Sequence, residues 1–366
     1  HLAQYCLRNK CIKEGCEQLV TRIAEAQGQP LDLLQLVLAS ACNNIGALIF
    51  GCRYPFDDSK HRELVNSIRD EFMLSRKKSM LSFLPSTLMN FAKHLPFTTA
   101  AAVHGTMESI EAFVGEHIHC ETGNVEPGNG SFLAKYAFYA NESRHKDTYI
   151  HNNSSLKGNA VGFLIPATVT VSAMLMRILL LVTANDEVQD RIQGEIEAVV
   201  GSERQPTWED RYVMPYTMAV MWEAQRWHTL LPLGLPRWAG QDVVIGKYLV
   251  PRGSTIIPNI WAVHNDPKHW IEPDKFDPSR FLNEDGSFAL ERLKNILPFS
   301  FGKRSCPGQT LASLEIFVYV TRMLQKFRIV PQVGSVLDAR IGDDVIMEPG
   351  RHMLRCIPRT PSSHFP

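Results

Sequence analysis

The spacing of hydrophobic residues predicts helices over most of the chain. Apolar residues that recur every three or four positions form one face of a helix, and that face packs against the rest of the protein. Segments of this kind cover residues 11–26, 60–76, 106–120, 187–200 and 207–228, and a nearly continuous apolar run over residues 31–50 predicts a further helix. We expect Gly51 to end the helix over residues 31–50, and residues 123–130 and 141–155 to be polar linkers.

The most hydrophobic stretch, residues 157–184, predicts a central helix that is apolar on all sides and therefore buried. A membrane span is the alternative, but Pro166 and Arg177 interrupt it, and the uncharged part is shorter than the ~20 residues that a bilayer needs. Proline inside a helix frees the carbonyl four residues earlier, here that of Gly162, and bends the helix. Pro166 therefore marks either a bend or an edge of a structural helix.

Two other regions depart from the helical pattern. Residues 81–97 contain two prolines and many large apolar side chains, which could cap a pocket, touch a membrane or simply pack. Beyond Pro232, short alternating segments at 242–245, 248–250 and 255–257 predict a small sheet with hairpin turns, and residues 329–358 predict a last pair of strands. The pattern as a whole predicts a mainly α fold with a small β region, and a length of 366 residues allows either one large domain or two ordinary ones.

Composition and charge narrow the classes of function. Hydrophobic residues make up 45% of the 366 positions, enough for a large buried core. Lysine and arginine number 38, as do aspartate and glutamate, so no nucleic-acid partner is expected. The eight cysteines have no metal-finger spacing, which favours reduced thiols that face the cytosol. His117, His119 and Cys120 are neighbours on a helix and do not share a face, so we expect no zinc there.

Cys306 is the residue with the most distinctive chemistry. Apolar periodicity from residue 309 onward predicts a helix, and Pro307 and Gly308 suit its first turn. The unpaired backbone N–H groups at a helix N-terminus favour an anion, so the thiol is biased toward thiolate, a strong ligand for soft metals. The alternative is a purely structural cysteine.

The whole loop, residues 299–308, has a more specific pattern than its cysteine alone. Its Phe-x-x-Gly-x-Arg-x-Cys-x-Gly spacing resembles the haem-ligand loop of the cytochrome P-450 family. In that family a cysteine thiolate on haem iron donates electron density that favours O–O cleavage. The resemblance implies that Cys306 is the iron ligand of haem b, and it places Phe299 and Gly308 at the cofactor and Arg304 at a haem propionate.

Four more residues fit the same resemblance. Glu223 and Arg226, with Arg280 in residues 276–281, resemble the network that braces the haem loop in this family, so they are implied to be structural supports. Arg237 lies where a family arginine or histidine meets a haem propionate, and a guanidinium suits a carboxylate.

The central helix matches the family less well. Thr170 stands at the position of the family threonine, which implies a proton relay, and Ala167 would border the oxygen site. Val169, however, replaces the usual acid of the relay, and this weakens the expectation of ordinary monooxygenation. By the same resemblance, the substrate pocket is lined by Ile165, Leu233, Val345 and Ile346.

The resemblance runs along the whole chain and is nearest to microsomal animal members, so it implies a single haem-thiolate domain over residues 1–366. The N-terminal anchor, first strands and early helices of the family are expected to be missing. The resemblance also implies a monooxygenase that inserts one atom of O2 into a small apolar substrate, in xenobiotic or lipid metabolism. Electrons would come from NADPH through a flavoprotein reductase, with cytochrome b5 as an optional donor, at the cytosolic face of the endoplasmic reticulum membrane. The alternatives are a haem-thiolate isomerase or dehydratase that needs no reductase, and a non-catalytic remnant that binds haem poorly.

Overall fold

The computed structural model describes residues 2–78, 91–121, 130–142, 153–334 and 353–359. These residues fall into two compact units. The first contains residues up to Met176 together with most of the chain after Lys326, and the second contains residues 177–325. The expectation of a single domain stays a prediction, and each unit is described by itself below.

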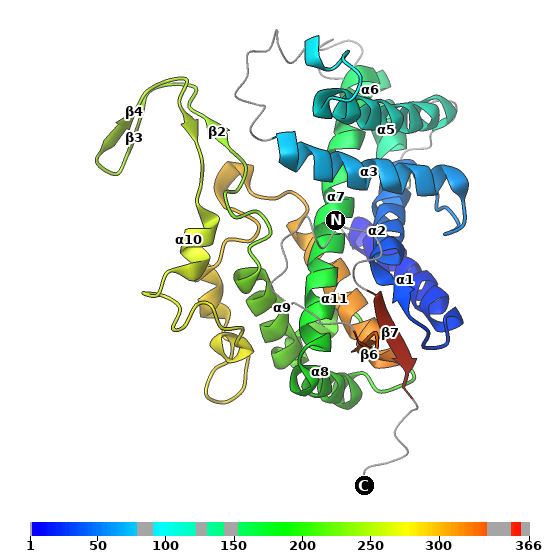
Figure 1. Cartoon of the computed structure of the whole chain (residues 1–366), viewed down its shortest axis with the longest axis vertical. Helices are drawn as coiled ribbons and strands as arrows, with labels where there is room; N and C mark the ends of the chain where they lie inside the picture. Colours follow the sequence, from blue (N-terminus) through cyan, green and yellow to red (C-terminus); the bar gives the residue numbers. More distant parts are fainter. Residues whose placement is uncertain (1, 79–90, 122–129, 143–152, 335–352, 360–366) are drawn as a thin grey trace. The chain divides into compact units, whose positions relative to one another are not determined.

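The first unit is built from helices and one small sheet (Figure 1). Its helices are α1 (Leu2–Glu25), α2 (Leu33–Phe50), α3 (Ser59–Lys78), α5 (Thr99–Glu121), α6 (Phe132–Glu142) and the larger part of α7 (Asn153–Thr183). Helix α1 packs on α2, and α3 packs on α5. As expected, Gly51 ends α2 in the left-handed conformation, with φ of 78°, and its N–H donates to the carbonyl of Ala47.

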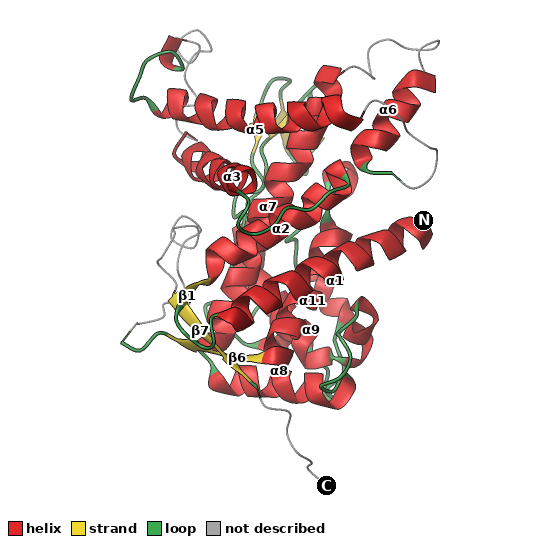
Figure 2. Ribbon diagram, turned by 90° about the vertical axis from the view of Figure 1, so that its right-hand side faces the viewer, coloured by secondary structure: helices red, strands yellow, loops and turns green. Residues whose placement is uncertain are grey.

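Three strands form the sheet of the first unit (Figure 2). They are β1 (Leu31–Asp32), β6 (Phe327–Pro331) and β7 (Met353–Pro358), in the order β1-β7-β6 and all antiparallel. The predicted pair of C-terminal strands is therefore present, with Ile329 opposite Cys356. The sequence did not predict β1, which is only two residues long.

Helix α7 contains Pro166 within its length. Both α2 and the stretch Ser154–Thr183 are long and apolar enough to cross a membrane by composition, but 78% of the apolar window in α7 is buried inside the protein. The side chains from Ala173 to Val182 are nearly all enclosed. The burial of this part of α7 agrees with the prediction of a core helix.

The second unit combines helices with two short hairpin-like strand pairs. Its α-helices are α8 (Asp186–Val199), α9 (Pro215–Trp227), α10 (Ile260–Asn265) and α11 (Gln309–Lys326). Short 3-10 helices are η3 (Trp208–Val213), η4 (Pro278–Phe281), η5 (Leu290–Asn295) and η6 (Gly302–Arg304). Strand β2 (Arg237–Trp238) pairs with β5 (Thr255–Ile256), and β3 (Val243–Ile245) pairs with β4 (Tyr248–Val250), all antiparallel.

One boundary in this unit differs from the prediction. The single helix expected over residues 207–228 is two, because η3 ends before Pro215 begins α9. A residue before proline is pushed out of the helical conformation, and Met214 accordingly has φ of −124° and ψ of 63°. Proline also fits the first turn of a helix, so it begins α9 and does not kink it.

Several expectations concern residues that the structure does not describe. Most of segment 81–97, most of the two linkers, and the proposed pocket residues Val345 and Ile346 lie outside the described ranges.

Candidate functional site

The Cys306 loop forms a tight turn that leads into α11. The Cys306 N–H donates to the carbonyl of Phe299 at 2.9 Å, which closes the loop on itself. Gly302 and Ser300 both have positive φ, 77° and 58°. Only glycine adopts such a conformation without strain, which explains the glycine three residues after Phe299. The loop ends where α11 begins, so Cys306 lies at a helix N-terminus.

The thiol of Cys306 is free and exposed. A side-chain carbon added at Gly308 would lie 3.8 Å from its sulfur, and one added at Gly302 would meet nothing within 4 Å. Phe301 is 72% exposed beside them. A free thiol in an open loop with an exposed aromatic ring fits a flat, largely apolar group that takes a thiolate ligand, and haem is such a group.

Two arginines meet at this loop. The Arg237 side chain, on β2, donates from Nη2 to the carbonyl of Arg304 at 3.0 Å. This contact joins residues 67 positions apart and brings both guanidinium-bearing residues to the thiol loop. Arg304 itself is exposed. Two arginines at the loop suit the two carboxylates of a haem, since a guanidinium can bind a carboxylate in forked geometry.

Glu223 and Arg226 form a fully buried ion pair on α9, both with 0% exposure. The guanidinium donates twice to the carboxylate, from Nε and from Nη2, each at 2.7 Å. Arg280 joins from η4, with its Nε 3.2 Å from the same carboxylate. The structure thus brings together the three residues that the sequence grouped, with bidentate geometry that gives such a pair most of its strength.

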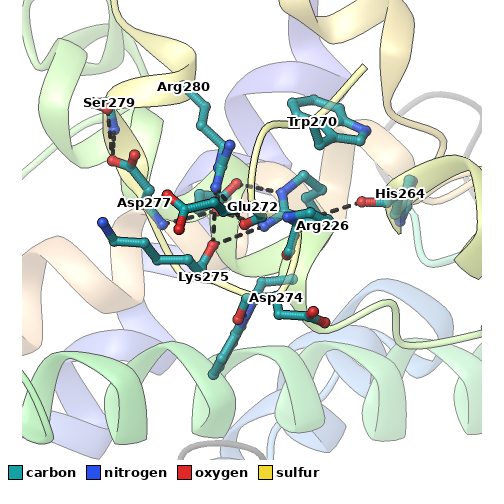
Figure 3. A network of polar contacts seen from close by, with 12 residues as sticks. Arg226, His264, Trp270, Glu272, Asp274, Lys275, Asp277, Ser279 and Arg280 are labelled. Carbon is teal, nitrogen blue, oxygen red and sulfur yellow. Dashed lines mark hydrogen bonds and ion pairs between the residues drawn. The ribbon is translucent and has the colours of Figure 1, made fainter. Parts of the chain in front are cut away.

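The two arginines also bind a long irregular segment (Figure 3). Arg226 donates to the carbonyls of His264, Pro273 and Lys275, at 2.9, 2.9 and 3.2 Å. Arg280 donates to the carbonyl of Glu272 at 2.8 Å and to that of Ile271. Residues 264–280 contain little regular structure, so these side chains replace the backbone hydrogen bonds that a helix or strand would supply.

His264 extends this network toward the thiol loop and was missed by the sequence analysis. Its Nε2 accepts the N–H of Leu297 at 2.8 Å, and its Nδ1 lies 2.8 Å from the hydroxyl of Thr229, which itself donates to the Arg226 carbonyl. Nδ1 therefore carries the proton and the ring is neutral. Burial, and to a lesser extent Arg226, lowers the pKa of His264 to about 4. No local pattern signals this role, because Leu297 is 33 residues away.

The oxygen-side residues proposed from sequence lie on α7, in the first unit. The Thr170 hydroxyl donates to the carbonyl of Pro166 at 2.7 Å. Val169 is buried at 2% exposure, while Ile165 and Ala167 are half-buried. Leu233, the other described pocket candidate besides Ile165, is in the second unit and is 55% exposed.

Comparison with known proteins points to one family. The family model described as Cytochrome P450 matches residues 8–356. Cytochrome P450 2J3 of Rattus norvegicus is 31% identical, over 95% of this chain and 68% of its own length. Cytochrome P450 2J1 of Oryctolagus cuniculus is 30% identical, over 98% and 71%, and Cytochrome P450 2B9 of Mus musculus is 31% identical, over 88% and 65%.

The fold and the thiol loop together define a haem-thiolate oxidoreductase. The chain belongs to the cytochrome P450 family. Membership makes it a monooxygenase that uses a haem iron with a cysteine thiolate ligand, O2, a substrate and redox partners. The relatives are of the microsomal animal type, which associates with the endoplasmic reticulum membrane.

Proposed function

We propose that the protein inserts one atom of O2 into a small apolar substrate, with electrons from NADPH delivered by a flavoprotein reductase. The observation that carries this proposal is the free, exposed Cys306 thiol at the start of α11, in a loop closed by its own backbone. The haem, when bound, supplies the activation of O2. Cys306 ligates its iron, while Phe299 and Gly308 shape the loop around the sulfur.

The basic side chains hold the cofactor in place. Arg237 and Arg304 bind the haem propionates, and the contact between them fixes the Arg237 guanidinium beside the thiol loop. Glu223, Arg226 and Arg280 do not touch the cofactor. They tie residues 264–280 to α9, and His264 passes this restraint to Leu297, two residues before the loop.

On the oxygen side of the haem, the Thr170 hydroxyl relays protons to the site of O2 activation. Its hydrogen bond to the Pro166 carbonyl holds the proton in the helix, and rotation of the side chain about χ1 presents the same proton to the site. Ala167 borders the oxygen position because its side chain is a single methyl group. Ile165 and Leu233 supply apolar pocket surface, with Val345 and Ile346.

A second candidate function is favoured by Val169. Its buried apolar side chain occupies the position of the acid that usually feeds protons to the site. A haem-thiolate enzyme that rearranges a peroxide or an oxime, as an isomerase or dehydratase, does not need those protons or a reductase. The two functions therefore differ in their demand for NADPH.

We also place the activity at the cytosolic face of the endoplasmic reticulum, with cytochrome b5 as an optional electron donor and lipids or xenobiotics as the substrate class. The microsomal type of the relatives supports this place.

The test combines the haem-loaded protein with reductase and NADPH in lipid vesicles, and measures product and NADPH oxidation for a panel of apolar substrates. Product that requires both reductase and NADPH supports the monooxygenase, whereas product from a hydroperoxide alone supports the second candidate. Thr170→Ala is expected to lower the ratio of product to NADPH consumed about tenfold or more, and Thr170→Ser to restore it. An unchanged ratio in Thr170→Ala would remove threonine from the proton path.

A further inference from the structure

A second reactive thiol lies in the first unit, at the end of α2. Cys52 follows the terminal Gly51 and is exposed to solvent. Its sulfur lies 3.7 Å from the hydroxyl oxygen of Tyr54, and that hydroxyl is hydrogen-bonded to Nε2 of His117 on α5. Three groups that can carry a proton, the Cys52 thiol, the Tyr54 hydroxyl and the His117 imidazole, are thus connected in series.

The backbone fixes the direction of this series. His117 Nδ1 is 2.8 Å from the carbonyl of Phe113, which can only accept, so Nδ1 carries a proton. Nε2 of the neutral ring is then an acceptor and takes the hydrogen bond of the Tyr54 O–H. The Tyr54 oxygen in turn accepts from the Cys52 S–H. A nucleophile, a relay, a base and a group that orients the base are all present.

The surroundings make His117 a better base. The nearby Cys52 side chain and the hydrogen bond to the Phe113 carbonyl raise the pKa of His117 above its ordinary value, against the effect of burial. Glu116 beside it acts in the same direction. The end of α2 opposes a thiolate, because the negative end of a helix dipole disfavours an anion. The thiol therefore depends on the imidazole for its reactivity.

An unsatisfied group borders the same cluster. His61 is 1% exposed, and its ring lies parallel to that of Tyr54, with centroids 5.5 Å apart. Neither of its ring nitrogens has a hydrogen-bond partner in the described part of the chain. A buried polar group without a hydrogen-bond partner is destabilising, and a polar ligand bound at the cluster would supply one.

We propose that Cys52 is a site of reversible thiolation by a small disulfide such as glutathione disulfide, activated through Tyr54 by His117. The Cys52 proton passes to the Tyr54 oxygen as the Tyr54 proton passes to His117 Nε2. The Cys52 sulfur attacks one sulfur of the disulfide, and the S–S bond breaks. The leaving thiolate takes the proton back from His117, which leaves one protein mixed disulfide and one free small thiol.

The test incubates the haem-loaded protein with glutathione disulfide at neutral pH and measures the rate of modification at each cysteine by peptide mass spectrometry. Native Cys52 is expected to react about tenfold faster than the same residue in the urea-unfolded chain, since a free thiol is only a few per cent thiolate at pH 7. An ordinary exposed thiol does not exceed the unfolded rate. A native rate at or below it would overturn the proposal.

Variants of Tyr54 and His117 supply a second test of the proposal. His117→Gln and Tyr54→Phe are each expected to slow modification of Cys52 about tenfold, while the free, half-buried Cys11 keeps its rate as the internal reference. His104→Gln, on the same helix and half-exposed, is the matched control and should change nothing. A merely structural role for His117 predicts the opposite, because loosening the cluster would expose Cys52 further and speed its reaction.

Discussion

Glu223 is the residue on which the buried network of the second unit depends. It accepts hydrogen bonds from Arg226, from Arg280 and from the backbone N–H of Asp277. Without its charge, the fully enclosed guanidinium of Arg226 would have no counter-ion. An unpaired buried charge is among the most costly defects that a protein can carry.

Glu223→Gln is therefore expected to lower the free energy of unfolding by about 3–5 kcal/mol, measured by urea denaturation. Glu291→Gln removes an equal charge from an exposed position and should change it by less than about 0.5 kcal/mol. Equal effects of the two substitutions would show that the buried pair contributes no more than a surface carboxylate.

His264 gives the stability of the protein a dependence on pH. Its pKa is about 4 in the folded protein and ~6.5 in an unfolded chain, so unfolding takes up a proton between these values. The stabilisation is therefore complete above pH ~6.5 and is lost as pH falls toward 4, on the order of 3 kcal/mol in all. Burial also lowers the pKa of His61 to about 4, which adds a loss of the same sign.

His264→Asn retains hydrogen-bonding groups but does not titrate in this range. We expect it to remove a large part of the fall in unfolding free energy between pH 6.5 and 5, with the His61 contribution remaining and the raised pKa of His117 acting in the opposite direction. His269→Asn, at an exposed position, should leave the fall unchanged. A wild-type slope in the His264 variant would contradict the neutral, buried ring.

Among the elements, the thiol loop depends on the backbone conformation of one glycine. Gly302 has φ of 77°, and a side chain there would meet no atom within 4 Å. The cost of substituting it is therefore conformational and not steric. Gly308 differs, because its φ is not in the left-handed region and an added carbon would make only an ordinary contact with the Cys306 sulfur.

Gly302→Ala is expected to lower the free energy of unfolding by about 1–2 kcal/mol, which is the cost of a left-handed conformation for a residue with a side chain. Gly308→Ala serves as the matched control and should change it by less than about 0.5 kcal/mol. Urea denaturation of both variants measures the difference. If Gly308→Ala were the more harmful of the two, the loop would have a different backbone from the one described.

The elements also show how far the sequence could lead. The hydrophobic pattern predicted α2 and α8 nearly to the residue, because α8 buries one face and shows this in its spacing, while α2 is a nearly continuous apolar run. It joined η3 to α9, because the effect of Pro215 on Met214 is a matter of backbone geometry that hydrophobic spacing does not register. Strand β1 was missed because its two residues gain their structure only from pairing with β7.

The residues of the site also divide into those marked by a local sequence pattern and those brought together only by the fold. Cys306, Glu223 and Arg226 could be found because each belongs to a short pattern of residues close together in the chain. The contacts of Arg237 with Arg304 and of His264 with Leu297 join positions 67 and 33 residues apart, and only the fold brings them together. The Cys52, Tyr54 and His117 cluster is of the same kind, since 63 residues separate the tyrosine from the histidine.

For the molecule as a whole, the central claim is that this chain holds a haem through the Cys306 thiolate. Its family membership, its thiol loop and the network behind that loop all point to this ligand. The most direct measurement is the absorption spectrum of the full chain, expressed with haem, reduced and saturated with carbon monoxide. We predict the Soret band of a thiolate-ligated haem in the wild type and its loss in Cys306→Ala. No such band in the wild type, or the same band in both proteins, would contradict the account.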